Sequence, residues 1–260
     1  MDQAADSRGG GRRSRIDSAA TMRRRLLLWD IDGTLVWWGP IGRGVFDDAI
    51  QEVVGRDPAG HGVSMGGKTD PQIALEIMGT LALEDGAAAE HLPLVLDALH
   101  RRTAEAESEF RVSGGTHPGV EDVLARLASV PGVLQTVLTG NVEPNMRVKL
   151  GVFGLDRWLD LDVAATGSDS PDRRELVPIA MRRAAERRGM PFVPDDVWVI
   201  GDTPRDLECA QVVGAHCALV ATGRNTENLD GLGADVVWRD LSGVDEVVAT
   251  LSPPRDEATA

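Results

Sequence analysis

Cysteine is scarce in this chain, which has Cys209 and Cys217 and no others among its 260 residues. Two cysteines without metal-ligand spacing provide neither a disulfide framework nor a zinc site. We therefore expect small buried thiols in a reducing, cytoplasmic setting. Long apolar runs are also missing, because no segment approaches the roughly 20 apolar residues that a membrane-spanning helix needs. The sequence thus predicts no membrane partner.

Lys and Arg are also fewer than Asp and Glu. The chain has 27 Lys and Arg against 41 Asp and Glu, which gives a formal net charge of −14. Nucleic acid and anionic membrane surfaces would repel such a protein, so we expect neither as a partner. An anionic small molecule is compatible with this charge, provided that its site supplies positive charge locally.

Both ends of the chain lack a periodic apolar pattern. Residues 1–25 are rich in Arg, Gly, Ser and Asp and are predicted to be a disordered tail, with Met1 and Met22 both open as the start residue. Three arginines before three leucines suggest a secretory signal, but Asp30 interrupts the apolar run too early for one. Residues 252–260, with two adjacent prolines, are predicted to be a second loose end.

From Leu26 onward, short apolar runs alternate with helical patterns. Val120–Ala128 and Leu176–Arg188, for example, carry apolar side chains at helical spacing. Such alternation predicts an α/β fold, namely a doubly wound parallel sheet with helices on both faces. The expected strands are Leu26–Ile31, Val133–Leu138, Leu161–Ala165, Val197–Ile200, Cys217–Val220 and Asp235–Trp238.

One segment interrupts this alternation. Pro71 there suits a first helical turn capped by Asp70 or Thr69, and Pro93 is expected in the first turn of a later helix. We predict an all-helical cap at residues 41–110, placed over the carboxyl edge of a core formed by residues 26–40 and 111–251. The helical patterns lie at Val45–Val54, Pro71–Leu81 and Glu90–Glu109.

The segment Asp30-Ile31-Asp32-Gly33-Thr34-Leu35 directly follows the first apolar run. Two carboxylates at the end of a buried strand are costly unless something compensates their charge, and a hard cation is the expected compensation. Gly33 permits a tight turn that brings backbone amides close to a ligand. The pattern therefore indicates that Asp30 and Asp32 serve a function.

Two further strand ends carry polar residues. Thr139 and Gly140 follow the second apolar run and form a phosphate-sized cradle, or else Thr139 or Asn141 only caps the next helix while Gly140 turns the chain. Asp202 follows a later run, and Asp206 lies in the first turn of the next helix. Complementing the helix dipole explains Asp206, but it does not explain Asp202.

Arg173 and Arg174 open a predicted helix, where positive charge opposes the helix dipole. One explanation is a solvated helix end, and the other is a cation that reaches a bound phosphate. In a parallel sheet these residues converge on one edge with the acids. Carboxylates about 4 Å apart repel by on the order of 4 kcal/mol at an effective dielectric near 20. Acids gathered in this way imply a divalent cation, and oxygen-only ligands point to Mg²⁺.

Together these motifs resemble those of the haloacid dehalogenase superfamily of phosphohydrolases, over nearly all of residues 26–251. The family carries a Lys or Arg at its third motif, and we expect Arg173 rather than Arg174 to fill that position. The first motif is matched residue for residue by Asp30–Leu35, the second by Thr139, and the fourth by Gly201, Asp202 and Asp206.

The resemblance implies a Mg²⁺-dependent phosphatase. Asp30 would attack phosphorus and form an aspartyl-phosphate, and Asp32 would protonate the leaving oxygen and then activate water. Thr139, Gly140 and Arg173 would bind the phosphoryl group. The implied metal ligands are Asp30, the backbone carbonyl of Asp32, and Asp202, with Asp206 supporting the site.

The helical insert resembles the smaller cap of phosphoglycolate-phosphatase-like members, which suits small phosphorylated metabolites. Its loop Met65–Pro71 contains Lys68, which would descend onto the substrate or, alternatively, is an exposed loop lysine. Phosphoglycolate, a sugar phosphate, pyrophosphate and a nucleotide monophosphate all stay open as substrates. The oligomeric state stays open as well.

Other activities compete with this interpretation. A phosphonate-cleaving relative would use Lys68 in a Schiff base, but that chemistry does not need Asp32. A dehalogenase also uses an Asp nucleophile, but it needs neither Asp32 nor the acids of the fourth motif. A phospho-accepting switch without turnover would combine the same groups, but in a single domain that has no inserted cap.

Overall fold

A parallel sheet forms the centre of the protein in the computed structural model, which describes residues 23–38, 41–223 and 229–254. Its strand order is β4-β1-β5-β6-β7, and each neighbouring pair is parallel. The predicted doubly wound α/β fold is therefore confirmed. The strands are β1 Arg25–Trp29, β4 Val133–Val137, β5 Val197–Gly201, β6 His216–Val220 and β7 Val236–Trp238.

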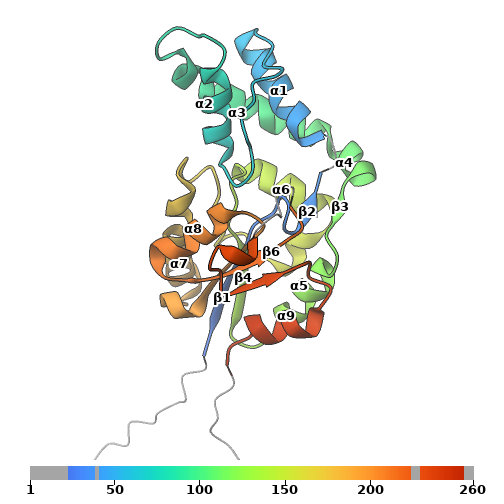
Figure 1. The fold of residues 1–260 in the computed structure, drawn as a ribbon, viewed down its shortest axis with the longest axis vertical. Coiled ribbons are helices and arrows are strands. Elements are labelled where there is room, and N and C mark those ends of the chain that lie inside the picture. The colour runs from blue at the N-terminus through green and yellow to red at the C-terminus, as the bar shows by residue number, and fades with distance from the viewer. Residues whose placement is uncertain (1–22, 39–40, 224–228, 255–260) are drawn as a thin grey trace, which may run out of the picture.

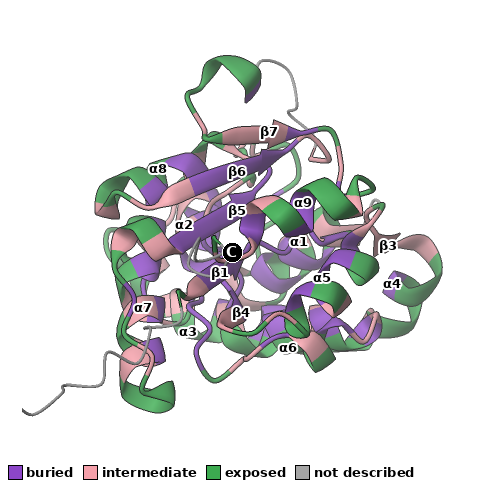
Figure 2. Cartoon of the chain, turned by 90° about the horizontal axis from the view of Figure 1, so that it is seen from below, coloured by how far each residue is buried: buried purple, intermediate pink, exposed green. Residues whose placement is uncertain are grey.

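The sheet is covered on both faces, as its nearly continuous apolar strands require. Alternate residues of β1 enter different cores: Leu27 and Trp29 pack with α5, α6 and α9, whereas Leu26 and Leu28 pack with α7 and α8. Figure 2 shows the buried strands between helices whose outer faces are exposed. The bounds are α5 Val120–Ala128, α6 Glu143–Val152, α7 Leu176–Arg188, α8 Pro204–Val213 and α9 Val244–Leu251.

The helical insert lies beyond one edge of the sheet (Figure 1). The chain enters and leaves it through a short antiparallel ribbon of β2 (Val36–Trp37) and β3 (Gly115–Thr116). Helices α1 and α3 pack through apolar residues that continue into the core of the sheet domain. The insert contains α1 Ile41–Val54, α2 Asp70–Gly79, α3 Ala87–Glu105 and α4 Glu107–Ser113.

Several boundaries differ from the sequence prediction, and the predicted helix Glu90–Glu109 is divided into α3 and α4 at Ala106. Helix α3 begins at Ala87 after Gly86, whose φ is +84°, so Pro93 lies in the second helical turn and not in the first. Arg25 begins β1, although the sequence assigns it to the tail. Residues 1–22 and 255–260 of the predicted tails lie outside the described residues. Among the described helices, none is long and apolar enough to cross a membrane.

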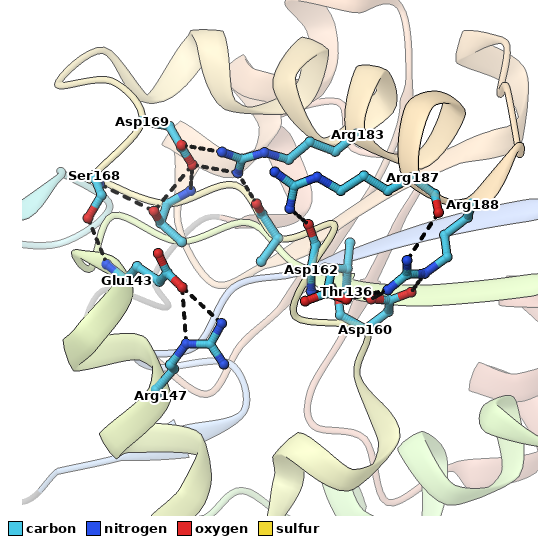
Figure 3. A network of polar contacts seen from close by, with 12 residues as sticks. Thr136, Glu143, Arg147, Asp160, Asp162, Ser168, Asp169, Arg183, Arg187 and Arg188 are labelled. Carbon is cyan, nitrogen blue, oxygen red and sulfur yellow. Dashed lines mark hydrogen bonds and ion pairs between the residues drawn. The ribbon is translucent and has the colours of Figure 1, made fainter.

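The predicted strand Leu161–Ala165 is wrong, because only an isolated bridge joins Leu138 to Ala165. Side chains take the backbone carbonyls that a strand would need for pairing. Thr136 donates to the carbonyl of Asp160, and Arg183 and Arg187 of α7 donate to carbonyls further along this segment. Figure 3 shows the resulting network, in which three arginines of α7 hold the segment.

Arg183 makes the most enclosed contact of this network. It donates to both carboxylate oxygens of Asp169 at 2.8 and 2.5 Å, and the two side chains are only 22% and 17% exposed. Asp169 also accepts from the backbone N–H of Thr166. The neighbouring Gly167 donates its backbone N–H to Asn141 at 2.8 Å, so this pair supports the loop after β4.

We expect Arg183→Met to lower the free energy of unfolding by about 1–3 kcal/mol, because it leaves a largely enclosed carboxylate without its bidentate partner. Urea unfolding measures the change. Arg147→Met is the matched control, since Arg147 pairs with Glu143 on the exposed side of α6 and should cost less than about 0.5 kcal/mol. Equal losses in the two variants would contradict this prediction.

Candidate active site

The predicted site residues lie at the carboxyl ends of adjacent strands. Asp30 follows β1, Thr139 follows β4 after one residue, and Asp202 follows β5. Because β1 pairs with both β4 and β5 in parallel register, these residues share one edge of the sheet, on the side where the helical insert lies (Figure 1). The structure therefore brings together the strand ends that the sequence singles out.

Asp30, Asp202 and Asp206 form a buried acidic cluster. One carboxylate oxygen of each lies within 4.8 Å of the others, and the three residues are 4%, 6% and 0% exposed. Burial raises the pKa of Asp30 and of Asp202 well above the usual range, and the neighbouring acids raise both further. Such a cluster is costly unless cations compensate it.

The cluster fits a divalent metal ion. Carboxylate oxygens within this span are the hard ligands that Mg²⁺ prefers. Gly33 has φ +90° and leaves no room for a side chain, because a Cβ there would lie 2.4 Å from an Asp202 oxygen. Thr34 donates its hydroxyl to Asp202 at 3.2 Å. The turn after β1 is thus packed directly against the acids.

Arg173 supplies positive charge inside the cluster. Its guanidinium lies 3.0 Å from Asp30 and 2.6 Å from Asp206, and its side chain is 6% exposed. Arg174, in contrast, pairs with Asp172 at 2.6 Å on the surface and is 62% exposed. The structure therefore places Arg173, and not Arg174, beside the acids. Both belong to a 3-10 turn, Arg173–Glu175, that precedes α7.

Both carboxylate oxygens of Asp206 accept hydrogen bonds. One carboxylate oxygen accepts from Arg173, and the other accepts from the backbone N–H and the hydroxyl of Thr203 at 3.0 and 2.7 Å. This capping box fixes the start of α8. Asp206 therefore holds both Arg173 and the turn after β5.

Asp32 points toward different neighbours from those of Asp30. Its side chain is 39% exposed and accepts from Lys149 at 2.9 and 2.7 Å and from Asn141 at 2.7 Å. Sequence reasoning misses both donors. Lys149 lies in the last turn of α6, where a basic residue is common because it complements the helix dipole, so its position alone carries no signal.

Thr139 and Asn141 do not cap the helix that follows. Helix α6 begins at Glu143, and its N-cap residue is Val142. The Thr139 hydroxyl instead accepts from the Asn141 side chain at 2.8 Å and is completely buried. The alternative explanation of Thr139 as a helix cap is therefore wrong.

The cap loop packs directly on this phosphate-sized turn. A Cβ at Gly140 would lie 2.0 Å from the carbonyl oxygen of Lys68, so only glycine permits the approach. The Asp70 backbone N–H donates to the Gly140 carbonyl at 2.7 Å, and its carboxylate accepts from the Val142 N–H at 2.9 Å. Thr69 caps α2, as one of the two predicted candidates.

A cavity of about 820 Å³ opens between the helical insert and the sheet edge. Lys68 lines it, but its ammonium forms an ion pair with Glu76 of α2. Apolar side chains of the insert and of β2 form much of the remaining wall. The polar lining includes Asp30, Asp32, Thr139, Asn141, Lys149 and Arg173.

Asp70 gives a test of how the insert is joined to the core. Burial raises its pKa to about 6, so the ionised carboxylate costs the folded protein free energy above that pH and nothing below about pH 4. Asp70→Asn keeps an oxygen for Val142 and removes the charge. We expect it to raise the free energy of unfolding at pH 8 by up to about 3 kcal/mol, and to have no effect at pH 4.

Urea unfolding of Asp70→Asn at pH 4 and pH 8 measures this difference. Asp85→Asn changes an exposed acid of the same insert and should leave stability unchanged at both pH values. A loss of stability in Asp70→Asn at pH 8 would show that the ionised carboxylate contributes more than its burial costs.

Comparison with known proteins finds relatives of this chain. The family model for haloacid dehalogenase-like hydrolases matches residues 27–211. Phosphoglycolate phosphatase 1 of Pseudomonas aeruginosa is 26% identical over 211 residues, which are 79% of this chain and 72% of that protein. A phosphoglycolate phosphatase of Rhodospirillum rubrum is 26% identical over 145 residues, or 55% of this chain and 57% of that protein.

Solved structures share the fold. CbbY from Rhodobacter sphaeroides, in complex with phosphate, has a TM-score of 0.62 at 16% identity and covers 84% of this chain and 95% of its own. A putative phosphoglycolate phosphatase from Lactobacillus plantarum has a TM-score of 0.60 at 17% identity, with 87% and 100% covered. The chain therefore belongs to the haloacid dehalogenase-like hydrolases, as a phosphatase that resembles the phosphoglycolate phosphatases.

Proposed function

We propose that the protein is a Mg²⁺-dependent phosphohydrolase that cleaves small phosphorylated metabolites through an aspartyl-phosphate on Asp30. The observation that carries this proposal is the buried contact of Asp30 with Arg173 beside Asp202. A carboxylate held in this way at the end of a central strand opens onto the cavity. It is thus placed to attack a phosphorus atom bound there.

Asp32 is the proposed general acid and base. It lies two residues after Asp30, lines the same cavity and is far more exposed than Asp30. In the first step it gives a proton to the leaving oxygen, and in the second it takes one from the water that attacks the aspartyl-phosphate. One carboxyl group suffices for both steps, because the leaving oxygen and the attacking water occupy the same side of phosphorus.

Other residues of the site are the proposed donors to the phosphoryl oxygens. The Thr139 hydroxyl and the turn at Gly140 lie at the end of β4, and Arg173 lies against Asp30. These groups are fixed before substrate binds, because Asn141 holds Thr139 and Asp206 holds Arg173. Donors fixed in advance stabilise the charge of the transferring group without reorganisation.

Asp30, the backbone carbonyl of Asp32, and Asp202 would hold the metal ion, with Asp206 in support. When bound, Mg²⁺ neutralises negative charge on the phosphoryl oxygens and helps to orient the group. Its charge would also offset the burial of Asp30 and Asp202, whose pKa values are raised by desolvation.

The cavity under the helical insert favours a small substrate. Lys68 lines it and is proposed to contact the leaving group once the ester displaces its partner Glu76. The proposed enzyme is cytoplasmic and has no nucleic-acid or anionic-membrane partner, since both surfaces would repel a net charge of −14. Phosphoglycolate is the first substrate to test, because relatives are named for it.

Phosphonate cleavage is less compatible with the structure. A lysine that forms a Schiff base needs a neutral amine, whereas Lys68 forms an ion pair with Glu76 and is only 11% exposed. A switch without turnover would not need Asp32 at the cavity wall. Both activities are outcomes that the following measurements distinguish.

We expect Asp30→Asn to reduce phosphate release at least about a thousandfold, because it removes the nucleophile. Asp32→Asn should reduce it about 10²–10⁴-fold and leave a phosphoenzyme that acid-quenched labelling detects. Asp245→Asn, at a 93% exposed carboxylate, is the control and should retain full activity. Normal turnover of Asp30→Asn would refute the nucleophile.

Metal dependence has its own test. Phosphate release from a panel of small esters should require Mg²⁺, disappear in EDTA and return when Mg²⁺ is restored, because the buried acids need a compensating cation. Isothermal titration of Mg²⁺ into Asp202→Asn should show weaker binding than in the unaltered protein. Undiminished turnover in EDTA would exclude the metal role.

A further inference from the structure

Trp37 of β2 presents an exposed indole to the cavity. It is 45% exposed, and of the exposed large apolar side chains among the described residues it is the one that lines the cavity. A Cβ at Gly115 of β3 would lie 2.9 Å from the Trp37 Nε1, so the indole packs on the ribbon where its neighbour has no side chain. Its position is thereby fixed before a substrate binds. An exposed indole held in this way is a stacking surface for a flat ring.

The indole stands on the leaving-group side of the proposed reaction. Asp32, the proposed acid for the leaving oxygen, forms an isolated backbone bridge with Val36, and Trp37 is the next residue. The Lys149 ammonium lies 2.7 Å from an Asp32 oxygen and 4.5 Å from the centre of the Trp38 ring. Both tryptophans line the cavity. A group that extends from the leaving oxygen into the cavity thus meets β2 and its aromatic side chains.

The helical insert adds further apolar side chains to the cavity wall. Phe46 of α1 and Ile73 of α2 are buried, and both line the cavity together with Met65 of the cap loop. Such side chains gain free energy when they cover apolar atoms, and they offer no charge to a polar group. The cavity volume of about 820 Å³ falls in the range of pockets that enclose drug-sized ligands. A two-carbon ester would leave most of this space to water.

A second anionic group finds no cation without a partner on the described part of the cavity wall. Arg173 and Lys149 form ion pairs with acids of the core, and Lys68 forms one with an acid of α2. Arg43 donates to a histidine ring and to a backbone carbonyl within the insert. The carboxylate of phosphoglycolate, or the second phosphate of a sugar bisphosphate, would have to displace one of these partners. An uncharged leaving group would not.

We propose that the preferred substrates are phosphate monoesters whose leaving group carries a flat aromatic ring, and that this ring stacks on Trp37. The inference rests on the proposed function, because that function puts the leaving oxygen at Asp32. It makes Trp37 a specificity-determining residue, and it predicts a substrate different from the phosphoglycolate for which the relatives are named. The ring displaces water from the apolar wall, and the ester needs no second anionic group.

Three esters of alcohols with similar acidity separate ring recognition from chemistry. Benzyl phosphate carries a flat ring, cyclohexylmethyl phosphate carries a saturated ring of similar size, and ethyl phosphate carries no ring. We expect kcat/KM for benzyl phosphate to exceed that for cyclohexylmethyl phosphate about 3- to 10-fold. It should exceed the values for ethyl phosphate and for phosphoglycolate more than about tenfold. A higher kcat/KM for phosphoglycolate than for benzyl phosphate would overturn the inference.

Matched variants complete the kinetic test. Trp37→Leu keeps an apolar side chain without a ring and should reduce the ratio of kcat/KM for benzyl over cyclohexylmethyl phosphate to about one. Trp37→Phe should keep part of this ratio. Leu94→Ala changes an exposed apolar residue of the insert outside the cavity lining and should keep all of it. Because the ratio compares two esters in one variant, a general loss of activity does not alter it. An unchanged ratio in Trp37→Leu would overturn the inference.

A binding measurement separates this inference from the proposed function. Calorimetric titration of the two ring esters into Asp30→Asn in the presence of Mg²⁺, with and without Trp37→Leu, reports recognition in the absence of turnover. We expect the added Trp37→Leu change to weaken benzyl phosphate about 3- to 10-fold and cyclohexylmethyl phosphate less than about twofold. Equal losses for the two esters, or no loss for either, overturn the inference. Absent turnover of every ester in the unaltered protein, with ring-dependent binding intact, overturns the proposed function alone.

Discussion

The ion pairs of Arg173 with Asp30 and Asp206 are the constraint on which the rest of the site depends. All three side chains are at least nine-tenths buried. Removing any one of them would therefore leave an uncompensated buried charge. Asp206 in turn fixes Thr203 at the start of α8. One guanidinium therefore ties the end of β1 to the start of α8 across the edge of the sheet, and it contacts Asp30, the proposed nucleophile.

The same constraint explains why the loops around the site are so tightly packed. A site with this much buried charge must exclude water while leaving one side open to a substrate. The loops pack this tightly because positions 33 and 140 are glycines. A side chain at Gly33 would overlap Asp202, and a side chain at Gly140 would overlap the cap loop. The arginines of α7 hold the segment behind the β4 loop (Figure 3), so that the Thr139 turn is supported from both sides.

The sequence predicts the fold and the strand-end residues because both follow from local patterns. Apolar runs place Asp30, Thr139 and Asp202 at strand ends, and parallel strands bring those ends together. The strand at 161–165 is a failure of the same reasoning, since side chains from α7 take its carbonyls and an apolar run does not reveal such long-range donors. Lys149 is missed for a related reason, because a lysine in the last turn of a helix is ordinary until the fold places it against Asp32.

The contacts of Asp32 also show how the cap and the core act as one site. The insert reaches the β4 turn through Asp70, whose carboxylate accepts from Val142 at the start of α6. Lys149 stands near the end of the same helix. Helix α6 thus links the contact with the insert at Asp70 to the contact with the core acid Asp32.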